Sequence, residues 1–142
     1  MKIYNIDEIY TEVISLLRMT KIFDLDEHTK IVSNTIYSTM HYDMNPYLVV
    51  ENEYILRVNE RGKIIIEYRT KDIDEALYWI LLEISWTISC KVINGDNDWK
   101  IQNSNRKTLV EKLFKDICYK YYDWYKRDRN IFNFNNSDFY NS

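Results

Sequence analysis

The segment 73–92 constrains the fold of this chain more than any other. Its apolar side chains recur at helical spacing on one side, and Trp79 and Trp86 occupy much of the remaining surface. A helix that is apolar nearly all round is a buried helix. We therefore predict a central helix over 73–92. Asp72 would cap it, and Glu75 would bond back to the cap amide as in a capping box.

Three runs before this helix follow the period of a β-strand. Residues 47–50, 54–58 and 63–69 are rich in β-branched and aromatic side chains and are separated by polar turn residues. Gly62 supplies the left-handed backbone position that a short hairpin turn requires. In the third run one set of side chains alternates with another, namely Ile64, Ile66 and Tyr68 with Ile65, Glu67 and Arg69. These runs predict a three-stranded antiparallel meander.

The flanking segments predict further helices. A helix over 8–19 would begin at Asp7 as its N-cap, and the stretch 20–45 would hold at most a short helix. Residues 94–104 have the turn residues of a loop. Ser104 or Asn103 would then cap a last long helix over 105–127.

Together these elements predict an α+β fold with an N-terminal helix, a three-stranded meander and two long packed helices. The length of 142 residues fits one domain, which we place at 1–129. Residues 130–142 are rich in Asn and are expected to form a weakly ordered tail.

The sequence offers no recognisable catalytic, cofactor or metal site. It has only two histidines, His28 and His41, and contains no C-x-x-C, H-E-x-x-H or G-x-S-x-G motif. Cys90 and Cys118 lie in helical sequence and are interpreted as reduced core thiols. An enzyme would have to use His28 or His41 with nearby acids, and this stays a minor hypothesis.

A calcium loop is also a poor match. Asn94, Asp96 and Asp98 imitate its first three ligand positions. However, Trp99 stands where the loop needs glycine, and Asn105 stands where it needs a bidentate Glu. We interpret this segment as a solvated loop.

The charge is unevenly distributed although the chain as a whole carries −3. Residues 100–129 hold nine Lys and Arg against four acids, a net +5, whereas residues 72–98 hold six acids against one Lys, a net −5. A basic, Tyr-rich helix over 105–129 is one way to bind nucleic acid. The alternative is that neighbouring segments of opposite charge attract each other, and the acidic balance of the chain favours it.

No segment is predicted to enter a membrane. The longest apolar run, 76–82, is far shorter than the roughly 20 residues that a helical span requires. The N-terminus lacks the apolar stretch of a secretory signal peptide. We therefore expect a cytoplasmic protein.

Two stretches resemble a known family. E-R-G at 60–62 is followed by T-K-D-I-D-E-A-L-Y-W-I at 70–80, and later Arg106 and Lys107 precede Leu113. This pattern is similar to the immunity protein 63 family of bacterial polymorphic-toxin systems over residues 45–127. The chain departs from the family pattern at 91–94, where an expected arginine is missing, and in the loop 94–104 and the tail.

The resemblance implies a protein that protects a bacterium from a cognate secreted toxin by tight, stoichiometric binding without catalysis. A nucleic-acid-associated or regulatory module using the helix 105–129 is the alternative. A standard protein interface buries about 1,200–2,000 Å² around a few aromatic or Arg anchors. The oligomeric state and the chemistry of the toxin are left open.

The residues expected to contact the toxin lie in turns and at a helix start. Four acids would meet a basic cleft, Trp99 would serve as an aromatic anchor in a polar loop, and Arg106 would be a contact or a structural tie. The four acids are Glu51, Glu53, Asp96 and Asp98. The alternatives are ordinary solvated turns for the acids and a Trp99 that folds back onto the domain. Tyr78 and Trp79, although part of the family pattern, are expected in the core.

Overall fold

The structure is a computed structural model that describes residues 2–37, 45–95 and 98–128. These residues form helices before and after a three-stranded sheet, which confirms the predicted α+β fold. In chain order the elements are α1 (Ile6–Leu17), α2 (Leu25–Tyr37), β1 (Tyr47–Val50), β2 (Tyr54–Glu60), β3 (Lys63–Thr70), α3 (Ile73–Val92), α4 (Trp99–Ile117) and α5 (Tyr119–Asp128).

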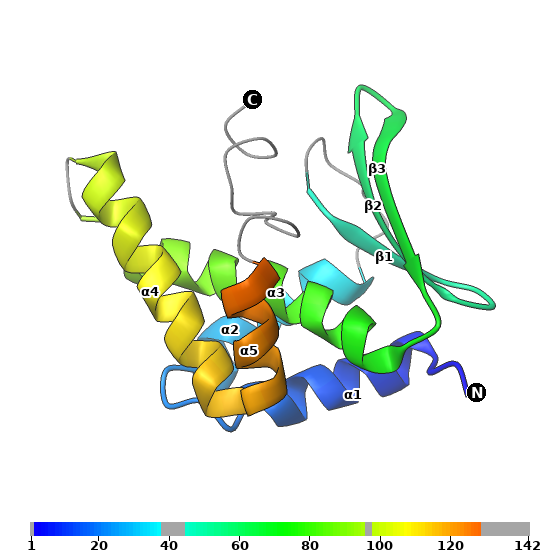
Figure 1. Cartoon of the computed structure of the whole chain (residues 1–142), viewed down its shortest axis with the longest axis horizontal. Coiled ribbons are helices and arrows are strands. Elements are labelled where there is room, and N and C mark those ends of the chain that lie inside the picture. Colours follow the sequence, from blue (N-terminus) through cyan, green and yellow to red (C-terminus); the bar gives the residue numbers. More distant parts are fainter. Residues whose placement is uncertain (1, 38–44, 96–97, 129–142) are drawn as a thin grey trace.

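α3 is the central element. It crosses the middle of the molecule, with the sheet toward one end and α4 and α5 toward the other (Figure 1). It contacts α1, α2, α4, β2 and β3. Eleven of its 20 residues are buried, as its all-round apolar pattern predicts. Tyr78 and Trp79 are 2% and 4% exposed, which confirms their place in the core.

Asp72 caps the start of α3 as predicted, but the second bond of the predicted capping box is absent. Asp72 is the N-cap, and its carboxylate accepts a hydrogen bond from the Asp74 N–H at 2.9 Å. The predicted return bond from Glu75 is wrong, because the Glu75 carboxylate accepts from the Thr70 hydroxyl instead. The Asp72 N–H donates to Thr70 Oγ1 at 3.0 Å. Thr70, at the end of β3, therefore takes the role expected of Glu75.

The three strands pair antiparallel in the order β1-β2-β3, which confirms the meander. Arg61 and Gly62 form the turn between β2 and β3, with positive φ angles of 51° and 79°. Two consecutive left-handed residues are typical of the type I′ turn, whose twist matches that of the paired strands. Gly62 thus occupies the left-handed position predicted for it.

The predicted alternation along β3 is wrong at one point, because the strand contains a bulge. Asn59 pairs with Ile64, whereas Val58 pairs with Ile66, so Ile65 is an extra residue in β3. Ile64 consequently shares the outer face of the sheet with Asn59, and does not share the core face with Ile66. The two-residue turn sets the strand pairing near Gly62, and the packing of the core sets the pairing from Val58–Ile66 onward. The two registers differ by one residue, and the bulge accommodates this difference.

The N-terminal helices also differ from the prediction. Asn5, and not Asp7, caps α1: Asn5 Oδ1 accepts from the Glu8 N–H at 2.9 Å, and Glu8 Oε1 accepts from the Asn5 N–H at 3.1 Å. α2 has 13 residues and is not a short helix. The Asp24 carboxylate serves its start by accepting from two N–H groups, those of Asp26 and Glu27.

The C-terminal helical segment is longer than predicted and is broken. α4 begins at Trp99 with Asp98 as its N-cap, so the predicted loop over 94–104 is wrong from Trp99 onward, and the caps Ser104 and Asn103 are wrong. The single helix over 105–127 is also wrong, since Cys118 has extended φ and ψ of −169° and 133° between α4 and α5. α5 folds back on α4, with the Phe114 and Tyr125 rings stacked at 5.4 Å.

Two further expectations concern the cysteines and membranes. Cys90 and Cys118 are free thiols and are half-buried, so they lie at the margin of the core. Burial raises the pKa of the Cys90 thiol. Among the described residues, no helix is both long and apolar enough to cross a bilayer. The predicted domain limits and the tail 130–142 stay predictions, because that tail lies outside the described residues.

Candidate functional site

The residues predicted to contact a partner form two groups at opposite ends of the molecule. Glu51 and Glu53 lie in the turn between β1 and β2, whereas Asp98, Trp99 and Arg106 belong to the start of α4 (Figure 1). Asp96 lies outside the described residues. A partner that faces one end of the long axis therefore contacts only one group.

The acids of the β1–β2 turn differ in their surroundings. Glu51 is exposed, and its N–H donates to the Glu53 carbonyl at 3.0 Å. The Glu53 carboxylate accepts from the Arg69 guanidinium at 2.7 Å. Glu53 is therefore already paired with a cation of its own chain.

That pair is one end of a chain of charges on the outer face of the sheet. Arg69 Nε also donates to Glu67 at 3.1 Å, and Arg57 Nε donates to Glu67 at 2.6 Å. The two guanidinium groups, with Arg57 the larger influence, lower the pKa of the Glu67 carboxyl. This network links β2 to β3 and gives Glu53 a structural role.

The first half of α4 projects from the core. None of residues 99–109 is buried, and the buried residues of α4 begin at Val110. Figure 1 shows this part of the helix extending away from α3 and α5. We call residues 99–109 the α4 arm.

The first turn of the α4 arm carries two exposed apolar side chains, which point to different sides of the helix. Trp99 is 60% exposed and Ile101 is 50% exposed, and Val92 at the end of α3 is 49% exposed. Asp98 caps the helix by accepting from the Lys100 N–H at 2.9 Å. Trp99 thus neither folds back into the core nor lies in a loop, since it is held on the first turn of a capped helix.

Arg106 fastens the arm to the rest of the molecule. Its Nε donates to the Ile93 carbonyl at 2.9 Å, just beyond the last residue of α3. Carbonyls at a helix end have no partner within the helix, and a cation there also meets the negative end of the helix dipole. Arg106 is therefore a positioning residue for the arm.

Sequence reasoning missed Ile101. Residues 99–105 are mostly polar, and that composition resembles a loop. A signal was present, however. Asp98 is a favoured N-cap residue, and counting the helix from it places Ile101 as well as Trp99 on the first turn.

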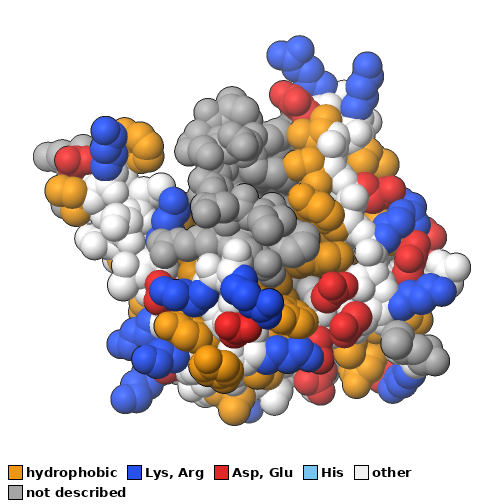
Figure 2. Space-filling model, viewed as in Figure 1, with side chains coloured by type: hydrophobic (Ala, Val, Ile, Leu, Met, Phe, Trp, Pro, Cys, Tyr) orange, Lys and Arg blue, Asp and Glu red, His pale blue; other side chains and the backbone are white. Residues whose placement is uncertain are grey.

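The cations of α5 are largely paired within the chain. Lys120 lies 2.6 Å from the Asp74 carboxylate of α3, and Lys126 lies 3.1 Å from Glu111. Arg127 pairs with Asp123 at 2.8 Å. Figure 2 shows Lys and Arg side chains over α4 and α5 with acidic side chains among them. These contacts favour attraction between oppositely charged segments over a nucleic-acid surface.

The histidines do not assemble a reactive centre in the described residues. His28 is 4% exposed, and its Nδ1 accepts from the Asp24 N–H at 3.0 Å at the start of α2. Its ring lies 5.8 Å from that of Phe23. His41 lies outside the described residues. In the part of the chain that the structure describes, no group of three His, Cys, Asp or Glu side chains is placed to hold a metal ion.

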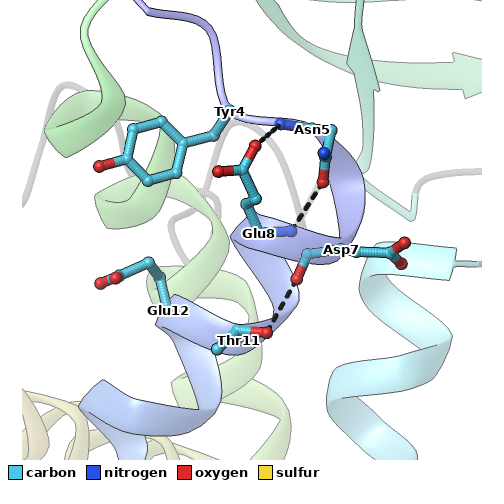
Figure 3. A pocket seen from close by; sticks show the side chains of 6 residues that line it. All are labelled: Tyr4, Asn5, Asp7, Glu8, Thr11 and Glu12. Atoms are coloured by element: carbon cyan, nitrogen blue, oxygen red, sulfur yellow. Dashed lines mark hydrogen bonds between the residues drawn. The ribbon is translucent and has the colours of Figure 1, made fainter.

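A shallow hollow of about 350 Å³ lies beside the start of α1 (Figure 3). Its lining residues are Tyr4, Asn5, Asp7, Glu8, Thr11 and Glu12. Nothing in the residue pattern predicts this hollow, because its acids fit an ordinary helix start.

The carboxylates of this hollow do not converge on one point. The side chain of Asp7 points away from those of Tyr4 and Glu12 (Figure 3), and Asp7 accepts from the Tyr37 hydroxyl at 2.6 Å. This bond raises the pKa of Tyr37 to about 12. Glu8 already binds the Lys2 ammonium of the same chain at 2.5 Å. These carboxylates therefore join α1 to α2 and to the N-terminal segment, and the geometry does not favour a ligand site.

The comparisons with known proteins give one match. The family model described as immunity protein 63 matches residues 51–131, more than half of the chain. The match begins in the β1–β2 turn and includes β2, β3, α3, α4 and α5. No curated protein and no solved structure matches the chain.

Proposed function

The chain belongs to the immunity protein 63 family, and from this premise we propose that it neutralises a cognate bacterial toxin by binding it directly and stoichiometrically. The single observation that carries the proposal is the family match over 51–131. The proposed partner is a toxin of a polymorphic-toxin system, and the proposed compartment is the bacterial cytoplasm. The proposed mechanism involves no catalysis by this chain. Instead, the bound chain would cover the active site of the toxin or block a movement that the toxin needs.

We assign the toxin contact to the α4 arm. Trp99 and Ile101 offer apolar surface at the end of a helix that the core does not cover. Tryptophan is enriched among the residues that dominate binding energy in protein interfaces. Asp98 would lie at the edge of this contact, and Arg106 would support it by holding the arm on α3.

The other predicted contacts remain proposals of lower rank. Glu51 is exposed but lies at the opposite end of the molecule, and Glu53 is engaged by Arg69. Asp96 precedes the arm in sequence. These three acids would contribute mainly to the rate of encounter with a basic toxin, because charges at the rim of an interface act on association more than on affinity.

Co-expression tests the proposed function. A toxin domain encoded directly upstream of this chain should stop growth when expressed alone, and expression of this chain should restore growth. The same cells should yield a one-to-one complex of the two proteins. Failure of rescue with every neighbouring toxin would contradict the proposal.

Substitution of the arm tests the assigned contact. We expect Trp99→Ala with Ile101→Ser to weaken the complex by about 10- to 100-fold, as the loss of an anchor residue does. The melting temperature should change little, since both side chains are at least half exposed. Tyr119→Ala is the matched control, because Tyr119 is 77% exposed at the start of α5, far from the first turn of α4. Equal effects of the two changes would contradict the assignment.

A further inference from the structure

The end of the β2–β3 hairpin is a second projecting apolar surface. None of residues 59–65, here called the hairpin end, is buried, whereas Val58 just before them is 0% exposed. Ile64 and Ile65 are 52% and 44% exposed. Figure 1 shows the hairpin extending beyond the helices, and Figure 2 shows hydrophobic side chains below Lys and Arg at its tip.

The bulge in β3 accounts for this exposure. It inserts Ile65 between the pairs Asn59–Ile64 and Val58–Ile66, so Ile64 is shifted off the core face of the sheet. Bulges re-aim side chains and are over-represented near functional sites. Thr has a similar preference for strands and would leave less apolar surface exposed. Threonine at both positions would therefore remove apolar surface while it preserves the preference for a strand.

The hairpin end is also preorganised. Its turn has the two left-handed residues of a type I′ hairpin, and the strands pair on both sides of the bulge. A surface that is already ordered loses little conformational entropy when it binds. Side chains on such an element suit a contact with another protein.

Two features of the hairpin end indicate the kind of partner: its bulged edge strand, β3, and the charge of its tip. A bulge twists an edge strand away from further pairing, which disfavours a strand of a second copy as the occupant. Glu60, Arg61 and Lys63 give the tip a net charge of +1, and Lys63 is exposed beside the isoleucines. The complementary surface is an apolar recess bordered by carboxylates.

We propose that the hairpin end is a second toxin contact, with Ile64 and Ile65 entering an apolar recess bordered by carboxylates on the toxin. This inference rests on the proposed function. The tip of the hairpin and the start of α4 project to the same side of the molecule (Figure 1). One partner can therefore contact both.

The test uses the full chain and the purified toxin domain encoded directly upstream, carrying a substitution that inactivates it. Binding is measured by calorimetry for the unaltered chain and for Ile64→Thr with Ile65→Thr. We expect binding that is at least about tenfold weaker for the double variant. Lys63→Glu should weaken binding as well, and more so at low salt. Leu25→Gln is the matched control, since Leu25 is 46% exposed on α2, and should bind like the unaltered chain.

The outcomes separate this inference from the proposed function. A melting temperature of the double variant close to that of the unaltered chain shows that any loss of binding is not a loss of folding. Unchanged binding by the double variant overturns the hairpin contact and leaves the proposed function standing. A dimer of the chain alone that the double variant abolishes also overturns the inference, in favour of self-association. Absence of any complex with the unaltered chain contradicts the proposed function itself.

Discussion

Within the described part of the chain, the Ser85 hydroxyl is a buried polar group without a hydrogen bond, and such a group lowers the stability of the folded state. Ser85 is 0% exposed in the middle of α3, and its hydroxyl has no hydrogen-bond partner among the described residues. Ser89, one turn later on the same helix and also 0% exposed, donates its hydroxyl to the Trp86 carbonyl at 2.6 Å. The described residues therefore satisfy the buried hydroxyl of Ser89 and leave that of Ser85 unsatisfied.

We predict that Ser85→Ala stabilises the protein. The change removes an unsatisfied polar group, which costs about 1–3 kcal/mol when buried, and Ala is the better helix former. The free energy of unfolding in urea should rise by about 1 kcal/mol. Ser89→Ala is the control and should be neutral or destabilising. Equal effects at the two positions would show that hydrogen bonding of the hydroxyl is not the cause.

Asp74 joins the start of α3 to α5. Its carboxylate accepts from the Lys120 ammonium at 2.6 Å and from the Tyr121 hydroxyl at 3.1 Å. The Lys120 bond is the larger influence, and together these bonds lower the pKa of Asp74 below its ordinary value of 3.8. A carboxyl with a depressed pKa stabilises the folded state above its ordinary pKa, and the effect is lost as the pH falls through the folded pKa.

We therefore predict a pH-dependent effect of Asp74→Asn. At pH 7 the variant should be less stable by about 0.5–1 kcal/mol, a modest loss because the pair is partly exposed. The difference should shrink as the pH falls below 3.8. Urea unfolding at several pH values measures it. A difference of the same size at pH 7 and pH 2 would contradict the assigned role of the carboxylate.

The α4 arm is an element that its own sequence scarcely supports. Short isolated helices are marginal in water, and no residue of 99–109 is buried. Three features support it: Asp98 caps its first turn, it continues into the packed half of α4 that begins at Val110, and Arg106 donates to the Ile93 carbonyl. A charge-assisted hydrogen bond of this kind contributes about 1.5–3 kcal/mol.

We predict that Arg106→Met loosens the arm while the core stays intact. The backbone amides of residues 99–109 should exchange with solvent about tenfold faster, because local opening becomes easier. Lys100→Met is the control, since Lys100 is exposed on the same arm, and should leave exchange unchanged. A uniform increase over α3 and α4 would instead show that Arg106 supports the core.

At the scale of elements, the bounds of helices and strands were predicted best where the apolar residues of a segment recur at the period of its structure and are buried. The bounds predicted for the central helix, 73–92, and for the first strand, 47–50, are those of α3 and β1. The length of α2 was underestimated because its polar composition hides a stripe of four buried residues, His28, Ile31, Val32 and Ile36. The break at Cys118 has neither Gly nor Pro to indicate it, since the folding of α5 onto α4 fixes it.

At the scale of the whole molecule, the candidate site was only partly predictable. The polar neighbours of Trp99 made its exposure one of two alternatives, and Trp99 is 60% exposed, although it lies in a helix and not in a loop. The separation of Glu51 from Asp98, and the pairing of Glu53 with Arg69, depend on tertiary structure that local patterns do not contain. The bulge at Ile65 likewise arises from a conflict between turn and core registers.

The charge of the whole molecule also fits a protein partner better than nucleic acid. The basic C-terminal segment faces the acidic start of α3, and the Lys120–Asp74 pair joins them at 2.6 Å. Tyr121 is buried in this contact, so its ring is not available to stack on a base. The cations of α5 are thus paired within the chain, and the apolar ends of α4 and of the hairpin are the surfaces that we propose face a partner.

The central claim is that this chain neutralises a toxin by stoichiometric binding, and a calorimetric titration tests it most directly. The chain is titrated into the inactivated toxin domain encoded directly upstream. We predict one transition at a molar ratio of one, with a dissociation constant of about 100 nM or lower, as specific interfaces of standard size give. Absence of binding to a toxin whose growth arrest the chain nevertheless relieves would contradict the account.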